Sequence, residues 1–144
     1  MKYKRPFHFV TSALRSANPT TVASVTGMNG QITTLGQYLF EWLTPDGYPD
    51  KIEYWSGNIV PRWSFSNLLA TQNSATTLVV STAPYLAGST AAAIDLIDQN
   101  FFGGEMPAVT RTGLLTYAGS ATLTDGKVRE LLALAISANA FQWY

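Results

Sequence analysis

Residues 89–104, STAAAIDLIDQNFFGG, decide the fold class of this chain. Four apolar residues recur here at the spacing of one face of an α-helix, namely Ala93, Ile94, Ile97 and Phe101. Ser89 or Thr90 provides the side-chain cap that the start of a helix prefers. Gly103-Gly104 suits the left-handed backbone at which helices commonly end. The segment therefore predicts a helix with defined boundaries.

Helical spacing continues on both sides of this segment. The other segments predicted to be helical are residues 6–17, 29–43, 60–72, 107–119 and 124–139, with a shorter candidate at residues 50–57. Pro6, Pro61 and Pro107 stand where helices are expected to begin, because the first turn leaves its N–H groups unpaired in any case. Asn18-Pro19 ends the first helix, since the residue before a proline disfavours helical backbone.

Residues 71–88, TQNSATTLVVSTAPYLAG, are the least regular part of the chain. Leu78-Val79-Val80 has the composition of a short strand, but a single strand has no partner with which to pair. We therefore predict a loop that packs its apolar residues on the helices. The fold class that follows is all-α: a single-domain bundle of five or six helices over residues 1–144, with a long irregular connection around residues 71–88.

The charge balance argues against nucleic acid and a membrane surface as partners. Nine basic and nine acidic residues give zero net charge, so the basic stripe expected of a nucleic-acid-binding protein is missing. No apolar stretch approaches the 18 or so residues of a membrane-spanning helix, and no polybasic patch indicates a membrane surface. Charged residues make up 12% of the chain against about 25% in typical soluble domains. Part of the weakly charged surface is therefore expected to meet a partner.

The sequence contains few residues that could bind a metal ion or a cofactor. The chain has no cysteine and one histidine, which leaves no thiolate site and no histidine pair for a transition metal. Asp46, Asp50 and Glu53 lie close together, but their spacing does not match a calcium-binding loop. We interpret Asp46-Gly47 as a turn and Asp50 as a cap. No metal and no cofactor are predicted.

A ligand pocket is one alternative for the region around the turn at residues 45–50. Aromatic walls are common in ligand sites, and this region is rich in aromatic and acidic side chains. The candidate pocket residues are Asp46, Tyr48, Asp50, Tyr54, Trp55 and Trp63. The simpler interpretation is that the aromatic rings pack back on the bundle and that the turn ends a helix.

His8, Ser12 and Arg15 are the candidate catalytic residues. They share the polar face of the first helix, where His8 and Ser12 are four residues apart. A serine activated by a histidine, with an arginine for the developing negative charge, is typical of hydrolases. However, that face has no acid to orient the imidazole, and the chain has no G-x-S-x-G motif. A solvated helix face explains the same pattern.

Four stretches resemble a known family. They are RPFHFVTSALR (5–15), LGQYLFEWLTPDGYPD (35–50), WSGNIVPRWSFSNLLA (55–70) and LLALAISANAFQ (131–142). They resemble sequence patterns in the C-terminal part of the bacterial domain of unknown function 1800 family, including its Arg-x-x-Phe-Ala helix. His8, Tyr38 and Asn139-Ala140 depart from the family pattern. The resemblance implies that this chain is the C-terminal fragment of a longer, often exported or periplasmic protein, and it supplies no catalytic residues.

Two functions follow as hypotheses. The first is a helical domain for assembly or partner binding in an exported protein. The alternative is a weak, metal-free hydrolase that acts on ester-like substrates in a hydrophobic aromatic pocket; a carbohydrate-binding module is a third reading without a defining motif. The N-terminus lacks the apolar core of a signal peptide, so the sequence leaves the localisation of this chain open.

A homodimer or a domain-swapped dimer is expected, because a fragment leaves its former interface bare. The residues expected to contribute are Phe7, Phe9, Phe141, Trp143 and Tyr144. Phe9 lies off the main apolar stripe of its helix, which predicts that it needs cover from elsewhere.

Overall fold

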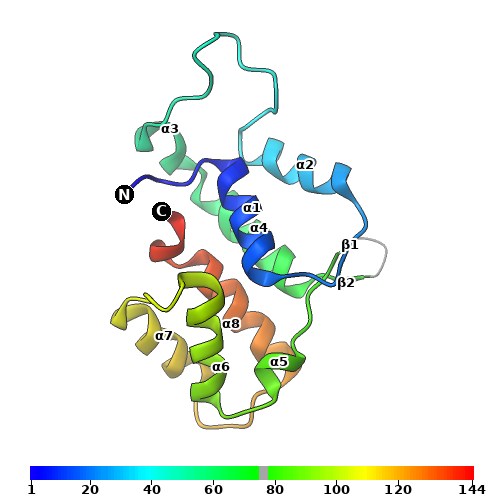
Figure 1. Cartoon of the computed structure of the whole chain (residues 1–144), viewed down its shortest axis with the longest axis vertical. Coiled ribbons are helices and arrows are strands. Elements are labelled where there is room, and N and C mark those ends of the chain that lie inside the picture. The colour runs from blue at the N-terminus through cyan, green and yellow to red at the C-terminus, as the bar shows by residue number, and fades with distance from the viewer. Residues whose placement is uncertain (75–77) are drawn as a thin grey trace.

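The fold is a bundle of helices around one core, in a computed structural model that describes residues 1–74 and 78–144 (Figure 1). The helices with eight or more residues in this part of the chain are α1 (Pro6–Ala17), α2 (Val25–Thr34), α4 (Ile59–Thr71), α6 (Thr90–Ile97), α7 (Ala108–Ala118) and α8 (Asp125–Ser137). Shorter helical segments are α3 (Ile52–Trp55), η1 (Ser56–Asn58), α5 (Ala83–Leu86), η2 (Asp98–Phe102) and η3 (Asn139–Gln142). The prediction of an all-α bundle with five or six principal helices is confirmed.

Local capping explains where most helices begin and end. Ser89 accepts a hydrogen bond from the backbone N–H of Ala92 at 3.2 Å and so starts α6. Thr124 does the same for α8. Asn18 ends α1 with a φ of 43°, in the left-handed region that asparagine tolerates. Gly103 ends η2 with a φ of 66°. These boundaries agree with the sequence prediction.

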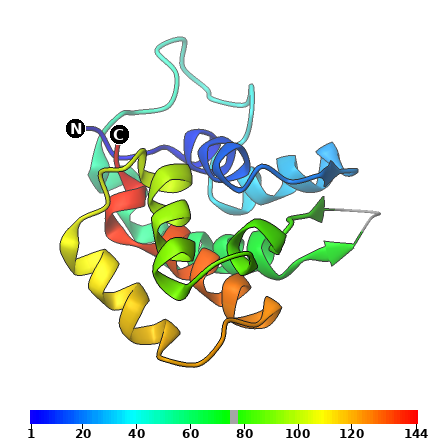
Figure 2. The same cartoon turned by 60° about the horizontal axis from the view of Figure 1, so that its bottom comes forward.

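The core lies where α4 crosses α8, and buried residues of α1 and α6 belong to the same hydrophobic cluster (Figures 1 and 2). Phe9 is fully buried there, and its ring centroid lies 5.8 Å from that of Phe65 and 6.0 Å from that of Phe141. The cover that the sequence predicts for Phe9 from elsewhere is therefore supplied by Phe65 and Phe141 of the same chain. The buried face of α1 is wider than the apolar stripe in its sequence, because Phe141 of η3 also packs on this helix.

The second helix is shorter than predicted. α2 ends at Thr34, and residues 35–51 form an irregular loop instead of the expected helix to residue 43. Gly36 and Phe40 have positive φ angles of 90° and 65°, which an α-helix does not allow. The hydroxyl of Tyr48 bonds to both the backbone N–H and the backbone carbonyl of Tyr38, at 2.8 Å each. A side chain thus takes the hydrogen bonds that a helix would have used.

The prediction that residues 78–80 are an unpaired loop is wrong. β3 (Leu78–Val79) is the central strand of a small antiparallel sheet, between β1 (Thr21–Val22) and β2 (Asn73–Ser74). Thr21 pairs with Val79, so the partner comes from a segment far away in the sequence. Residues 75–77 of the predicted irregular connection lie outside the described part of the chain.

The two ends of the described chain lie side by side, as both views show (Figures 1 and 2). Tyr3 and Trp143 form an antiparallel bridge, with the N–H of Lys2 donating to the carbonyl of Tyr144 at 2.9 Å. Of the helices in the described residues, none combines the length and the apolar character needed to cross a membrane. The joined termini form one wall of a cleft.

Candidate functional site: a cleft beside the joined termini

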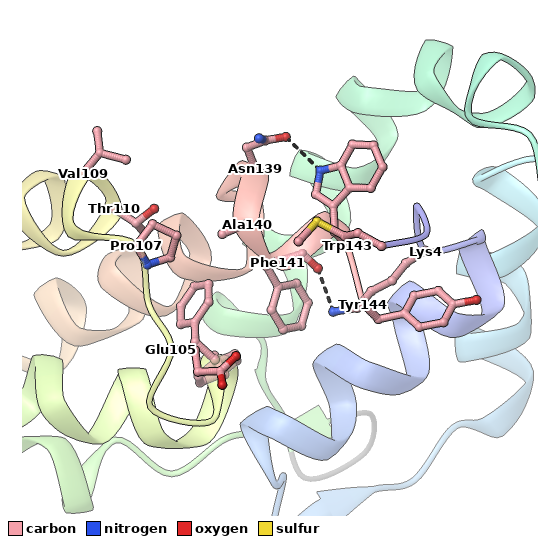
Figure 3. A pocket seen from close by; sticks show the side chains of 13 residues that line it. Lys4, Glu105, Pro107, Val109, Thr110, Asn139, Ala140, Phe141, Trp143 and Tyr144 are labelled. Atoms are coloured by element: carbon pink, nitrogen blue, oxygen red, sulfur yellow. Dashed lines mark hydrogen bonds between the residues drawn. The ribbon is translucent and has the colours of Figure 1, made fainter.

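A cleft of about 740 Å³ lies between the joined termini, η2 and the start of α7 (Figure 3). This volume is in the range of about 300–1,000 Å³ that is usual for ligand sites. Most of the lining is apolar. The aromatic side chains around it are Phe101, Phe102, Phe141, Trp143 and Tyr144. The polar lining residues are Lys4, Glu105, Thr110 and Asn139.

One wall depends on a π-helical turn. η2 continues α6 with this wider winding, and the ring centroids of Phe101 and Phe102 lie 6.0 and 6.2 Å from that of Phe141. The carboxylate of Asp98 accepts a hydrogen bond from the backbone N–H of Met106 at 2.9 Å, which fixes the return of the chain towards α7. Turns of this kind are rare and are frequently found at functional sites.

Lys4 supplies a buried cation at the cleft. Its side chain is 7% exposed, and its Nζ donates a hydrogen bond to the carbonyl of Phe141 at 2.7 Å. The same Nζ lies 3.8 Å from the centroid of the Phe141 ring. Burial, and to a smaller extent the charge of Arg62, lower the pKa of Lys4 to about 8. In the described part of the chain no carboxylate forms an ion pair with it.

Arg62 holds the backbone of this region in place. It is fully buried on α4 and donates to the side-chain oxygen of Gln142 at 3.0 Å and to the carbonyl of Lys4 at 2.5 Å. Its guanidinium carbon lies 4.4 and 4.8 Å from the ring centroids of Tyr3 and Phe9. Burial lowers the pKa of Arg62, while Tyr3 acts in the opposite direction. Its Nε is buried without a hydrogen-bond partner among the described residues.

Lys4 gives the lining of the cleft a positive charge, and Arg62 adds a second buried cation bonded to the Lys4 backbone. A buried charge is costly unless a counter-ion or several hydrogen bonds compensate it. Carbonyl oxygens, an amide oxygen and aromatic faces provide partial compensation, but neither Lys4 nor Arg62 has an acidic partner in the described residues. The arrangement is therefore suited to an apolar ligand that carries an anionic group.

Lys4 and Arg62 were not among the predicted site residues. The signal for Arg62 was its place in the Arg-x-x-Phe pattern of the family resemblance, which also contains the core residue Phe65. For Lys4 the sequence offered only a charged residue near one terminus. Its surroundings come from η3, at the other end of the chain.

The predicted catalytic residues all lie on α1. The ring of His8 lies 4.2 Å from that of Tyr144, and its pKa is lowered by partial burial and by the charges of Lys4, Arg5 and Arg15. In the described structure no hydrogen bond joins His8 to Ser12, and Arg15 is exposed to solvent. His8 thus borders the cleft through Tyr144, whereas Ser12 and Arg15 are not among its lining residues.

The predicted aromatic pocket is largely filled by its own rings. Trp42 and Tyr48 have ring centroids 4.4 Å apart, those of Tyr54 and Trp55 are 4.6 Å apart, and those of Tyr48 and Trp55 are 5.7 Å apart. The indole N–H of Trp55 donates to the carbonyl of Pro49 at 2.7 Å. The rings pack as the simpler interpretation of the sequence proposed.

The other candidates from that region are dispersed. Asp50 forms ion pairs with Lys2 at 3.3 Å and with Arg5 at 3.4 Å, which tie the loop to the N-terminal segment. Asp46 is hydrogen-bonded to the hydroxyl of Thr44. Trp63 stands apart on α4, half-exposed beside Leu134 of α8. Among the residues described, no group of three potential ligand side chains is placed to hold a metal ion.

Comparison with known proteins places the chain in a family. The model of the family described as "Protein of unknown function (DUF1800)" matches residues 1–143. No curated protein and no solved structure matches the chain. The predicted family resemblance is confirmed.

Proposed function

The chain belongs to the DUF1800 family, and from the geometry of the cleft we propose that this domain recognises a partner and does not catalyse a reaction. Partner recognition was the first of the two functions inferred from the sequence. The cleft adds a place for it, with aromatic walls and a buried amine but without a nucleophile paired to a base among the described residues. Such a surface stabilises a bound apolar group by removing it from water.

The observation that carries the proposal is the unpaired ammonium group of Lys4 in an apolar cleft. Among the described residues Phe141 is the one hydrogen-bond partner of this ammonium group, and five aromatic side chains line the same cleft. A ligand with a carboxylate next to an apolar body would complete both halves of the site. Hydrogen bonds between charged groups are worth about 1.5–3 kcal/mol, so the carboxylate is expected to matter for affinity.

A pair of small probes tests this directly. Binding of 3-phenylpropionate and of its neutral amide is followed by NMR chemical-shift perturbation of the residues that line the cleft. The acid is expected to bind about tenfold more tightly than the amide. Lys4→Met removes this preference, whereas Lys51→Met, which changes an exposed lysine, keeps it. Equal binding of acid and amide by the wild type contradicts the proposal.

The hydrolase remains a second candidate because of one observation. The lowered pKa of His8 favours the neutral imidazole, which is the state a general base requires. Turnover of an activated ester is measured with and without a chelator in the wild type and in His8→Ala. Chelator-insensitive turnover that disappears in His8→Ala supports this alternative, and equal rates in the two proteins exclude a role of His8.

A further inference from the structure

The loop between α2 and α3 presents an apolar tip to solvent. The loop runs away from the helices in both overall views (Figures 1 and 2). Two of its apolar side chains, Phe40 and Leu43, are fully exposed. Between them, the carboxylate of Glu41 has no hydrogen bond or ion pair within the described residues. Exposed apolar groups gathered in one place commonly mark an interaction site.

This tip is held by a packed base. Trp42 lies with its ring centroid 4.4 Å from that of Tyr48 and 5.8 Å from that of Tyr54. The two hydrogen bonds between the Tyr48 hydroxyl and the backbone of Tyr38 fix the chain just before the tip. The loop thus presents Phe40 and Leu43 from an ordered support, which reduces the entropy lost on binding.

Phe40 is also strained. Its φ of 65° lies in the left-handed region, which costs a non-glycine residue about 1–2 kcal/mol. No packing of the Phe40 side chain within this chain compensates for the strain, because the side chain is fully exposed to solvent. Backbone strain of this kind clusters at sites where a binding partner makes use of the conformation.

The tip and the cleft have complementary chemistry. The sequence Phe40-Glu41-Trp42-Leu43 places an acid between apolar side chains, and the cleft places the ammonium group of Lys4 among apolar walls. None of the residues that line the cleft comes from the loop, so the two features do not meet within one molecule. Each is left incomplete in the single chain.

We propose that the cleft of one copy of this chain receives the loop tip of a second copy, with Phe40 and Leu43 against the aromatic walls and the Glu41 carboxylate at the Lys4 ammonium. This inference rests on the proposed function and names its partner. If both copies exchange loops, the contact closes as a two-fold dimer, the commonest symmetry of soluble oligomers. Glu105, the other carboxylate at the cleft, is exposed, and solvent screens its repulsion of Glu41.

The mass in solution is measured by size exclusion coupled to light scattering. The wild type is expected at twice the 15.7 kDa mass of one chain. The double variant Phe40→Ser/Leu43→Ser is expected at the single mass. Val25→Ser is the matched control, since this side chain is exposed on α2, away from both the loop and the cleft, and its variant stays dimeric.

A second variant acts on the other half of the contact. Val109 lines the cleft and is itself exposed, so Val109→Asp places a charge in the binding site without disturbing the core. It is expected to be monomeric. When mixed, the loop variant and the cleft variant form a heterodimer, because one intact loop then meets one intact cleft. Circular dichroism verifies that every variant keeps the helical content of the wild type.

The charged pair has its own test. In a protein that keeps Lys4, Glu41→Gln is expected to weaken the affinity of the dimer about tenfold. In a protein that already carries Lys4→Met, Glu41→Gln is expected to have no further effect on this affinity. A dimer that survives the loop substitutions overturns the inference. So does a wild type that stays monomeric; if it still prefers 3-phenylpropionate over the amide, the proposed function stands without this partner. A monomeric wild type with no preference between the probes overturns both.

Discussion

Arg62 shows how this small domain keeps a cation in its core without an acid beside it. The planar guanidinium reaches an amide oxygen and a backbone carbonyl on two different segments, while its faces contact Tyr3 and Phe9. A lysine offers no comparable fork and no planar face for stacking. The side chain therefore connects α4 to both termini at once.

Replacing Arg62 is expected to destabilise the fold. Arg62→Met fills a similar volume but leaves the oxygen of Gln142 and the carbonyl of Lys4 buried without this donor. A buried acceptor left unpaired costs about 1–3 kcal/mol, so the free energy of unfolding in urea is expected to fall by about 2–4 kcal/mol. Arg15→Met, at an exposed site on α1, is the control and changes stability by less than about 0.5 kcal/mol. Similar losses in both variants contradict this role.

Lys4 makes stability depend on pH in a defined direction. Its pKa is about 8 in the folded chain and 10.5 as the ordinary value, so between these pH values the unfolded chain holds more protons. The free energy of unfolding therefore rises with pH across this window, and the destabilisation is fully present below pH 8, where both states are protonated.

Urea unfolding of the wild type and Lys4→Met at about pH 7 and about pH 9.5 measures this effect, because the difference between the proteins isolates Lys4 from other titrating groups. The wild type is expected to gain stability relative to the variant at the higher pH. If the free energies of unfolding of the wild type and of Lys4→Met change with pH in parallel, Lys4 is not the source of the pH dependence.

At the scale of elements, short-range hydrogen bonds define where the helices begin and end. The irregular loop at residues 35–51 shows that a tertiary contact can prevent a helix that the spacing of apolar residues predicts. Leu35 is buried, Leu39 packs on the core, and Trp42 enters the aromatic cluster, whereas Tyr38 and Phe40, which the sequence also assigned to the apolar side of this helix, are exposed. The segment forms a loop because Tyr48 binds the backbone of Tyr38. Helical spacing correctly predicted that Leu35, Leu39 and Trp42 face inward, but it predicted neither the exposure of Phe40 nor the irregular backbone of this segment.

The cap of α8 offers a test at this scale. Thr124 accepts a hydrogen bond from the backbone N–H of Lys127 at 3.2 Å, at the start of the helix that crosses α4 in the core. Thr124→Ala is expected to lower the free energy of unfolding by about 1 kcal/mol, as for other lost caps. Thr122→Ala, at an exposed position just before the helix, serves as the control and is expected to be neutral. A neutral Thr124→Ala shows that water replaces the cap.

At the scale of the whole molecule, the last residues close the core. Phe141 is buried among Phe9, Phe101 and Phe102, so it joins α1, η2 and η3 at one point. The bridge between Tyr3 and Trp143 places Lys4 above its ring. The cleft and the stability of the domain therefore depend on the same contact between the two ends of the described chain.

Substitutions of two aromatic residues in the same terminal segment, Phe141 and Tyr144, distinguish a core position from a position at the cleft. Phe141→Ala is expected to lower the free energy of unfolding by about 3–5 kcal/mol, because it empties a core position. Tyr144→Ala removes a half-exposed ring that contacts His8 in a tilted arrangement, and it is expected to cost less than about 1 kcal/mol. Thermal and urea unfolding compare the two variants, and losses of equal size contradict the assignment of Phe141 to the core.

The sequence by itself determined the helical class and most helix boundaries. Ser89, Thr124 and Gly103 act on backbone groups within the next or preceding turn, so their effect is readable from neighbouring residues. The resemblance also indicated the family, and its Arg-x-x-Phe pattern contained Arg62. The aromatic residues near the turn at residues 45–50 were recognised as a packing group.

Only the tertiary structure decided the small sheet and the cleft. Val79 finds its partner at Thr21, Arg62 reaches Gln142 across 80 positions, and Lys4 reaches Phe141 across 137 positions. Local spacing carries no information about such pairs, because each depends on how separate elements pack. The buried charge of Lys4 arises in the same way: a residue that reads as a solvated terminus becomes the polar centre of an apolar site when the other end of the chain folds over it.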